Sequence, residues 1–463
     1  DGIIVLEDDV PVGTKAATYF QLEDDYEIEI GLTPNRSDAM GHVGVARDLV
    51  AYLNVHENGN LALNFPSVEA FKVDNNDLQI TVSVEDNELC PRYMGTSIQG
   101  VKVGPSPAWL QKRLRSIGLS PINNVVDVTN FVMHELGTPL HAFDADKLNG
   151  KLVVKTAKNK EKFTTLDGVE RELSSENLMI TNGDDNLCIA GVLGGLNSGI
   201  SNTSTNVFLE SAYFNAVSVR KTAKMHALNT DASFRFERGV DPNLTDYALK
   251  RAALLIQEVA GGKIAMDIVD TNKKPIADWT IDFNYERSNR LIGHTISEEM
   301  VDAILKNLDI DTLEKKGKDL TLKIPAYRVD VTREADVIEE ILRIYGFNNV
   351  PIPAKLNSTV SYFVKPDIEK VQTVVSEMLV GQGFVETLNN SLTKSDYSKK
   401  LGGDVINPER NVEMLNPLSI DLDVMRQSMI FNAMEMIAHN QNRQNADLKL
   451  YEFGKTYHKF DSG

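Results

Sequence analysis

Cysteine is nearly absent from this chain of 463 residues, which contains only two. Cys90 and Cys188 stand far apart and form no CxxC pair, so the sequence predicts neither a disulfide framework nor a cysteine-based zinc site. This scarcity favours a reducing, cytoplasmic location. No apolar run is long enough to predict a membrane span, and no signal peptide is recognisable at the start.

Positive charge is also scarce, because 48 Lys and Arg face 66 Asp and Glu and leave a formal net charge of -18. Proteins that coat duplex or single-stranded nucleic acid need broad basic grooves, and this composition excludes such a surface. Two short basic segments, 111–116 and 219–226, could form local patches. Solvated helix faces are the commoner explanation for segments of this kind.

Familiar catalytic motifs are missing as well. The segment "GVLGGLNSG" (191–199) is rich in glycine but has neither the Lys-Ser/Thr of a phosphate loop nor GxGxxG order, so a tight turn between strands explains it more simply. There is no GxSxG elbow and no HExxH pair. His141 and His226 stand among polar residues, although a lone histidine is more often structural than catalytic.

The length predicts about three domains, and an apolar content of 42% can fill their cores. Hydrophobic periodicity and turn residues predict strands near 78–84, 99–103, 151–156 and 205–210, and helices over 108–117, 243–260 and 366–382. Before these, strand-like "YEIEIGL" leads to a helix that Ser37 or Asp38 would cap. Polar or proline-containing stretches at 54–67, 271–279 and 351–366 predict linkers.

One acidic stretch, "RVDVTREADVIEE" (328–340), has two explanations. Helical spacing places Asp336, Glu339 and Glu340 on one face, with Asp330 just before the helix. Four converging carboxylates would suit Mg²⁺ better than Zn²⁺. The alternative is a solvated helix face with Thr332 as its cap, and spacing alone favours this alternative.

Several strings, taken together, resemble the beta subunits of bacterial phenylalanine-tRNA ligases (phenylalanyl-tRNA synthetases). They appear in the order of that family and span most of residues 25–460. The strings are "GLTPNRSDAMGHVGVARD", "INNVVDVTNFVMHELGTPLHAFD", "LDGVERELSSENLMI", "IAGVLGGLNSGISNTSTNVFLESAYF", "TDASFRFERGVDP" and "YRVDVTREADVIEEILRIYGF".

The resemblance implies an α+β, multidomain fragment that lacks the N-terminal and C-terminal domains of the family. Its parts would be a mixed α/β editing domain, a small α+β module with a metal site, and the start of a degenerate class II synthetase-like domain built on an antiparallel sheet. The implied ranges are 1–27 for the tail of an oligonucleotide-binding fold, 28–67 for the rest of that region and a linker, 68–275 for editing, 276–350 for the small module, and 351–463 for the class II-like domain.

The resemblance also implies a division of labour. The alpha subunit would activate phenylalanine with ATP within a heterotetramer of two alpha and two beta subunits. The beta subunit would support the assembly, contact the phenylalanine tRNA and hydrolyse tyrosine wrongly attached to that tRNA. Residues 362–463 would then act as an interface scaffold without ATP chemistry.

Residue roles carried over from the family follow the matching strings. The resemblance places His141, Asn130 and Thr129 near the aminoacyl ester, and it assigns Mg²⁺ to Asp330, Asp336, Glu339 and Glu340. This assignment favours the metal site, whereas spacing alone favours the solvated helix face. The ion would have a structural or interface role. The residues implied to form the amino-acid pocket are Gly191 and Gly194 at its floor, Glu210 at the tyrosine side chain, and Thr230 and Ala232 at its wall.

The strand-like segment around Glu210 gives an independent observation. A period of two turns Val207 and Leu209 to one face, and Phe208 and Glu210 to the other. A carboxylate beside Phe208 recognises a tyrosine hydroxyl, or it forms a salt bridge to Arg235 or Arg238.

One departure from the family is Phe234, which stands where the family often has histidine and which therefore receives no catalytic role. Two further readings stay open beside the editing enzyme. One is a binding scaffold whose editing pocket no longer works. The other is an unrelated Mg²⁺-dependent hydrolase.

Overall fold

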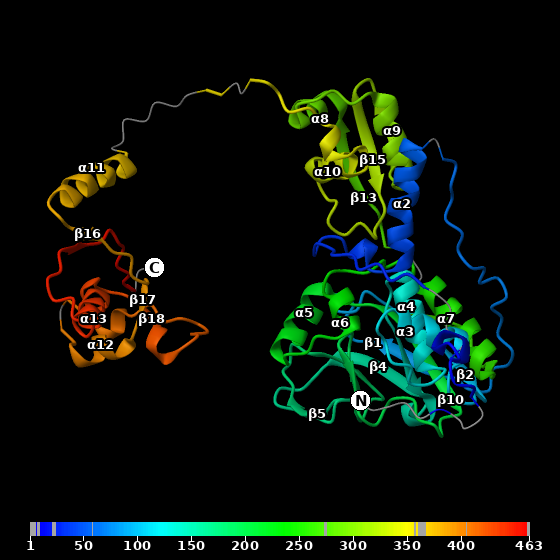
Figure 1. Ribbon diagram of the computed structural model, residues 1–463. Coiled ribbons are helices and arrows are strands. Elements are labelled where there is room, and N and C mark those ends of the chain that lie inside the picture. The colour runs from blue at the N-terminus through cyan, green and yellow to red at the C-terminus, as the bar shows by residue number, and fades with distance from the viewer. Residues whose placement is uncertain are drawn as a thin grey trace. The chain divides into compact units, whose positions relative to one another are not determined.

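The computed structural model describes residues 6, 10–20, 25–57, 59–272, 276–355, 358–359, 367–403 and 405–460 (Figure 1). The chain divides into two compact units, residues 1–352 and 353–463. Within the described part, no helix is long and apolar enough to cross a membrane. Cys90 and Cys188 are both buried free thiols.

The first unit is built on two five-stranded sheets. One sheet is antiparallel and has the order β11-β2-β10-β3, with β12 also paired to β2. The other has the order β1-β4-β7-β8-β9, and in it only the β1-β4 pairing is parallel. The bounds are β1 Thr81–Val84, β2 Arg92–Gln99, β3 Leu140–Asp144, β4 Lys151–Thr156, β7 Leu178–Thr181, β8 Asn186–Ile189, β9 Leu193–Gly194, β10 Asn206–Tyr213, β11 Lys263–Ile264 and β12 Val269–Asp270.

Alternation along β10 divides the buried residues into two cores. Val207 and Leu209 belong to a core formed with helices α3 (Ala108–Ser116), α4 (Val126–Leu136) and α7 (Thr245–Ala260), which cover that face (Figure 1). Phe208 belongs to a core shared with β4, β7 and β8 of the other sheet. The two sheets therefore face each other across this second core, and the predicted period of two along β10 is confirmed.

Two helices and a small hairpin complete the part of the chain that contains the two five-stranded sheets. Helices α5 and α6 lie beside the second core, to which Val219, Ala223 and Phe236 contribute. Strands β5 and β6 pair antiparallel. The bounds are α5 Ala216–Met225, α6 Asp231–Phe236, β5 Lys162–Thr164 and β6 Glu170–Glu172.

A third core lies in the segment from β13 to α10. Its antiparallel sheet has the order β13-β15-β14 and packs against α8, α9 and α10. The long helix α2 (His42–His56) joins this core through Ala51 and contacts both α9 and α4 (Figure 1). The bounds are β13 Trp279–Asn284, α8 Tyr285–Ile292, α9 Glu298–Asn307, β14 Asp311–Lys316, β15 Asp319–Ile324 and α10 Glu334–Tyr345.

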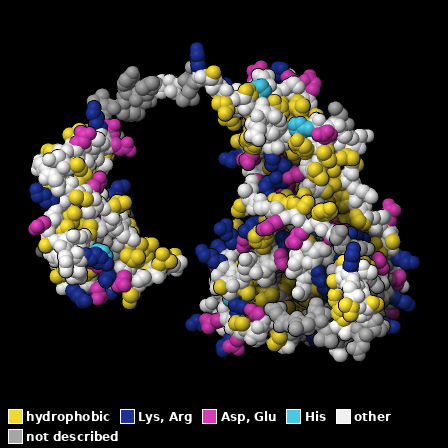
Figure 2. Space-filling model, in the orientation of Figure 1, with side chains coloured by type: hydrophobic (Ala, Val, Ile, Leu, Met, Phe, Trp, Pro, Cys, Tyr) yellow, Lys and Arg dark blue, Asp and Glu magenta, His cyan; other side chains and the backbone are white. Residues whose placement is uncertain are grey.

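The second unit contains helices α11, α12 and α13 and two separate strand pairs. Strands β17 and β18 are antiparallel, but β16 and β19 are parallel, so among the described residues the expected antiparallel sheet is present only as one short pair. Hydrophobic side chains gather on its surface (Figure 2). Val371, Val374 and Met378 of α11 are among the exposed ones. The bounds are α11 Ile368–Gly381, β16 Val385–Glu386, β17 Leu392–Thr393, α12 Ser395–Lys400, β18 Val424–Met425, α13 Ile430–Gln441 and β19 Leu450–Tyr451.

Three local predictions are wrong. The strand expected at 99–103 is β2, which ends at Gln99 because Gly100 adopts a positive φ of 77°. The segment 26–32 forms no strand, since its side chains are exposed and it has no pairing partner among the described residues. Helix α2 begins after Gly41, because the Asp38 carboxylate is bound by the Arg36 guanidinium instead of capping a helix.

Candidate active site and acidic cluster

Glu210 lies in the middle of β10, on the face that looks toward the second sheet. The register places it directly opposite Gly95 of β2 on one side and opposite His141 of β3 on the other. Side chains of directly opposed residues share a face and lie about 5 Å apart at Cβ. The structure therefore brings Glu210 and His141 together, as neighbours on one sheet surface.

Glu210 is buried, with 5% of the residue exposed. Its hydrogen-bond partner is the Tyr93 hydroxyl, which donates to Oε2 at 2.5 Å. Burial raises the pKa of Glu210 to about 8, against the opposing effect of the Tyr93 hydrogen bond. At neutral pH this side chain is thus mainly a neutral acid, which can both donate and accept a hydrogen bond.

The salt-bridge alternative for Glu210 is wrong. Arg235 donates to the Asp231 carboxylate and to the Met40 carbonyl. Arg238 pairs with the neighbouring Glu237. Both guanidinium groups are therefore committed to other acceptors.

His141 is the neighbour of Glu210 on β3. Its ring packs edge-on against Phe143, with 4.4 Å between the centroids. Burial lowers the pKa of His141 to about 4, so the imidazole is neutral at physiological pH. Its Nε2 atom is buried and has no hydrogen-bond partner among the described residues. A buried polar atom without a partner is uncommon and marks a position that a ligand or water can satisfy.

The glycine-rich loop lies beside His141. A Cβ atom on Gly194 would stand 3.1 Å from His141 Cε1, so only glycine leaves this side of the ring uncrowded. Gly191 has a φ of 68°, and a Cβ there would meet Phe214 and Phe236, so its identity is also required by packing.

Thr230 and Ala232 lie at the start of α6, next to this loop. The Thr230 hydroxyl donates to the Val192 carbonyl at 2.7 Å and accepts from the Ser233 amide as the helix N-cap. Ala232 packs against the core between the sheets. The hydrogen bond between Thr230 and Val192 therefore joins the glycine-rich loop to the start of α6, the two segments predicted to form the floor and the wall of the amino-acid pocket.

Thr129 and Asn130 are placed differently. They lie on α4, which packs against β3 on the face that carries Ala142, whereas His141 points to the other face. The Thr129 hydroxyl donates within the helix to the Val126 carbonyl at 2.7 Å. The described contacts do not join either residue to His141 or Glu210, so their roles stay predictions.

Phe234, the residue that departs from the family pattern, has a packing partner. The Arg238 guanidinium carbon lies 3.8 Å from the centroid of its ring. A cation over an aromatic face is stabilising, and this contact accounts for Phe234 without a catalytic role.

The acidic stretch at the start of α10 is held by arginines. Asp336 accepts from the backbone amides of Thr332 and Arg333 and from the Arg333 side chain, so Asp336 rather than Thr332 satisfies the helix start. Glu334 accepts from the Asn284 amide and from Arg287. The Thr332 cap is therefore a wrong prediction.

Glu340 belongs to a buried network of charges. It is 6% exposed and accepts from Arg328 at 2.6 Å and from Arg343 at 2.7 Å. Arg343 also pairs with Asp48 at 2.8 Å, and Arg36 of the N-terminal region pairs with Asp48 and Asp38. The three arginines balance the three acids of this network, which is named here the arginine network.

The predicted Mg²⁺ ligands do not fit a metal site in this arrangement. Glu340 is committed to two arginines, Asp336 caps α10, and Asp330 accepts from the Asn35 amide while burial raises its pKa. The part of the chain that the structure describes contains no group of three His, Cys, Asp or Glu side chains placed to hold a metal ion. The ligand set Asp330, Asp336, Glu339 and Glu340 stays a prediction of the resemblance.

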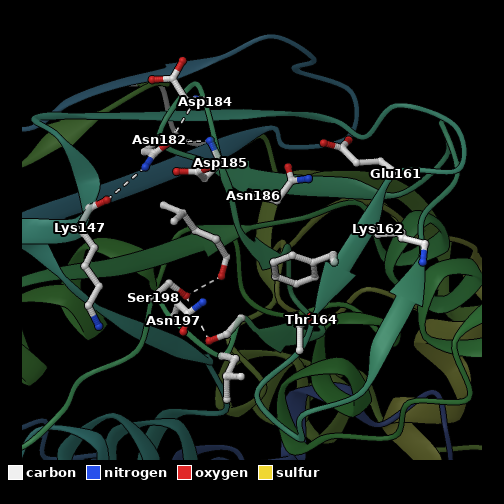
Figure 3. Close-up of a pocket in the computed structure, with 14 residues that line it drawn as sticks. Lys147, Glu161, Lys162, Thr164, Asn182, Asp184, Asp185, Asn186, Asn197 and Ser198 are labelled. Atoms are coloured by element: carbon white, nitrogen blue, oxygen red, sulfur yellow. Dashed lines mark hydrogen bonds between the residues drawn. The ribbon is translucent and has the colours of Figure 1, made fainter.

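A polar pocket of about 680 Å³ has neither Glu210 nor His141 among its lining residues (Figure 3). Lys147 and Lys162 stand on opposite sides of it (Figure 3). Lys162 pairs with Glu170 at 2.6 Å and Lys147 with Asp144 at 3.7 Å, so both cations already have carboxylate partners. The lining residues are Lys147, Glu161, Lys162, Phe163, Thr164, Asn182, Asp184, Asp185, Asn186, Leu187, Gly195, Leu196, Asn197 and Ser198.

Three protein-family models match the chain. Residues 89–261 match the B3/4 domain, residues 281–347 the tRNA synthetase B5 domain, and residues 352–463 the phenylalanyl tRNA synthetase beta chain CLM domain. The first of these ranges contains Glu210, His141 and the glycine loop. The second contains β14, β15 and most of β13, together with Arg328 and Arg343. These domains define the chain as part of an aminoacyl-tRNA synthetase.

Curated relatives make the assignment narrower. The chain is 52% identical over 467 residues to the phenylalanine-tRNA ligase beta subunit of Bacteroides fragilis strain YCH46, 49% identical over 462 residues to that of Porphyromonas gingivalis, and 41% identical over 460 residues to that of Carboxydothermus hydrogenoformans. These alignments cover 99% or more of the chain. The chain belongs to the family of phenylalanine-tRNA ligase beta subunits, and the resemblance is confirmed.

The chain spans 56% of the length of these relatives. Among solved structures, an N-terminal fragment of the phenylalanyl-tRNA synthetase beta subunit from Pyrococcus horikoshii covers 67% of this chain and 84% of its own, at 16% identity. Its TM-score of 0.34 is too low to support a comparison of folds.

Sequence reasoning missed Tyr93 as a component of the site. The residue stands in "CPRYMG", which carries no recognisable motif. The sequence shows that Tyr93 and Gly95 are two residues apart and so share a strand face. Glu210, which Tyr93 contacts, lies 117 residues further along the chain. Only the register of β2 against β10 reveals the contact.

Proposed function

We propose that this chain is the editing and scaffold part of a phenylalanine-tRNA ligase and that it hydrolyses tyrosine wrongly attached to the phenylalanine tRNA. The observation that carries the proposal is the buried Glu210 carboxyl beside a neutral, partly buried His141 on adjacent strands of the B3/4 domain. ATP-dependent attachment of phenylalanine would take place on the alpha subunit of a heterotetramer with two subunits of each kind.

Glu210 would select the amino acid. A tyrosine hydroxyl can hydrogen-bond to this buried carboxyl group, whereas phenylalanine would leave the group desolvated and without that partner. Sites of this kind discriminate by factors of about 10⁴. Gly191, Gly194, Thr230 and Ala232 would enclose the ring, and the tie between Thr230 and the loop supports such a rigid wall.

His141 would act at the ester. In the reaction, water adds to the ester carbonyl, the bond to the ribose oxygen breaks, and tyrosine and free tRNA are released. A neutral imidazole can take the proton of the attacking water, and burial keeps His141 in that form. Asn130 and Thr129 would position the ester from α4.

Partners follow from the family. The B5 and CLM domains support contacts to tRNA and to the alpha subunit, and the exposed apolar side chains of α11 are suited to burial in a subunit interface. The resemblance implies a Mg²⁺ ion, but the hydrogen bonds of Glu340 and Asp336 to arginines and backbone amides do not fit a metal site, and no step of the hydrolysis is assigned to the ion.

Deacylation of tyrosyl-tRNA by the chain tests the proposal directly. We expect hydrolysis of tyrosyl-tRNA well above the spontaneous rate, and much slower hydrolysis of phenylalanyl-tRNA. If tyrosyl-tRNA is hydrolysed at the same rate with and without the chain, in a preparation that binds the tRNA, the chain is a binding scaffold whose editing pocket does not work.

Replacing Glu210 by Ala should remove the preference for free tyrosine over free phenylalanine. The expected loss is about 1 to 3 kcal/mol of tyrosine binding, because one hydrogen bond to a buried acceptor is lost. Isothermal titration with both amino acids measures the preference. An unchanged preference in folded Glu210→Ala protein would exclude Glu210 as the discriminating group.

Replacing His141 by Ala should slow deacylation by about 10²-fold or more while tyrosine affinity changes little, because the imidazole acts at the ester rather than at the ring. Single-turnover rates and titration separate the two effects. The matched control is His226→Ala, since His226 lies in the same domain and bonds to Asn177. Similar rate losses in both variants would show that His141 has no specific part in the reaction.

A further inference from the structure

Tyr93 is the residue through which the sheet holds Glu210. Ala212 is the register partner of Tyr93, and Gly95 is the register partner of Glu210, so Tyr93 and Glu210 lie diagonally on one sheet face. Gly95 has no side chain that could stand between them. The Tyr93 side chain is 0% exposed, and its hydroxyl reaches Glu210 Oε2 at 2.5 Å.

The Tyr93 hydroxyl is the donor of this hydrogen bond. Burial and the neighbouring Glu210 raise the pKa of Tyr93 well above its ordinary value of 10, so the phenol keeps its proton and donates it. The donated hydrogen bond occupies Oε2. Glu210 Oε1 has no hydrogen-bond partner within the described residues, and it is the oxygen left for another group.

Holding a glutamate in one rotamer has a thermodynamic consequence. A free glutamate side chain loses about 1.5 to 2 kcal/mol of rotamer freedom when it is ordered. If folding has already ordered it, a ligand that binds Glu210 does not have to meet that cost.

We propose that Tyr93 is a positioning residue for amino-acid specificity: its hydroxyl holds the Glu210 carboxyl group so that Oε1 meets the hydroxyl of a bound tyrosine. The inference rests on the proposed function, because it takes tyrosine as the amino acid that Glu210 selects. Tyr93 does not touch the ligand in this scheme and acts only through Glu210.

A double-mutant cycle separates this role from simple core packing. Four proteins are compared: wild type, Tyr93→Phe, Glu210→Ala and the double variant. Titration with free tyrosine and free phenylalanine gives the preference of each protein. Tyr213→Phe is the matched control, because it removes a tyrosine hydroxyl from β10 without touching Glu210.

We expect Tyr93→Phe to lower the tyrosine preference about tenfold, the equivalent of one hydrogen bond, and Tyr213→Phe to leave it unchanged. In the Glu210→Ala background, Tyr93→Phe should change nothing further, since residues that act through one another are not additive. Thermal unfolding of each variant shows whether it is folded. If Tyr93→Phe is not folded, Glu210→Gln replaces it: the amide oxygen still accepts from Tyr93, so this variant should keep more tyrosine preference than Glu210→Ala.

Three results would overturn the inference. An unchanged or increased preference in Tyr93→Phe would mean that the hydroxyl does not orient Glu210 or competes with the ligand for it. Equal tenfold losses in both backgrounds would assign Tyr93 a general packing role. In the replacement experiment, equal tyrosine preferences in Glu210→Gln and Glu210→Ala would also assign Tyr93 a general packing role. A wild type without any preference for tyrosine would instead refute the proposed function itself.

Discussion

Glu340→Gln should destabilise the first unit by about 3 to 5 kcal/mol, the range expected when one partner of a buried ion pair is removed. The substitution leaves the shape of the side chain nearly unchanged but removes its charge. Arg328, whose side chain is 2% exposed, would then remain buried with its next carboxylate, Asp38, only at 4.0 Å. A buried charge without a close partner is among the few causes of so large an effect.

Glu339→Gln is the matched control for this prediction. It makes the same chemical change one position earlier in α10, at an exposed side chain, and should change the free energy of unfolding by less than about 0.5 kcal/mol. Urea unfolding followed by the fluorescence of Trp279, in a Trp109→Phe background, reports on the sheet next to α10. Equal, small effects of both substitutions would contradict the arginine network.

The same pair of variants addresses the metal. If Glu339 and Glu340 were both ligands of one Mg²⁺ ion, each substitution would weaken Mg²⁺ binding in calorimetry. In the arrangement described here Glu340 serves Arg328 and Arg343 instead. Its removal should therefore act on stability with or without added Mg²⁺.

The acidic stretch shows what periodicity can and cannot predict. Helical spacing placed Asp336, Glu339 and Glu340 near one another along α10, which is a local property of the chain. It gave no information about Arg36 and Asp48, which come from the N-terminal region, far from α10 in the sequence. Whether carboxylates bind a cation or arginines depends on such distant partners.

The same distinction holds at the candidate active site. Alternation correctly divided Phe208 and Glu210 from Val207 and Leu209, because a strand has a strict period of two. The family strings brought His141 and Glu210 into one hypothesis. The contact with Tyr93 was not predictable, since the register between strands distant in sequence is set by the packing of both cores and not by either strand alone.

Glu210→Gln should change how the free energy of unfolding varies with pH, compared with the wild type. In the unfolded chain the carboxyl ionises near its ordinary pKa of 4.5, whereas in the folded protein burial holds the pKa at about 8. Between these values the folded state binds the proton and the unfolded state does not. The stability of the wild type therefore falls as pH rises through this window, by up to about 5 kcal/mol at pH 8.

His141 works in the opposite direction. Burial lowers its pKa from 6.5 to about 4, so between these values the unfolded state binds more protons and stability rises with pH. His134, whose pKa is also lowered to about 4 by burial, adds to this effect. The wild-type profile alone would thus conceal the contribution of Glu210 below pH 6.5.

The difference between Glu210→Gln and wild type isolates that contribution, because both histidines are common to the two proteins. Glutamine keeps an acceptor for the Tyr93 hydroxyl and cannot ionise. The difference should be nearly constant below pH 4.5, should increasingly favour the variant from there to pH 8, and should level off above it. Glu176→Gln, at an exposed side chain of the same domain, is the control and should follow the wild type at every pH. A difference that does not change between pH 4.5 and 8 would mean that Glu210 does not keep its proton in the folded protein, and the buried neutral acid would have to be abandoned as the group that selects tyrosine.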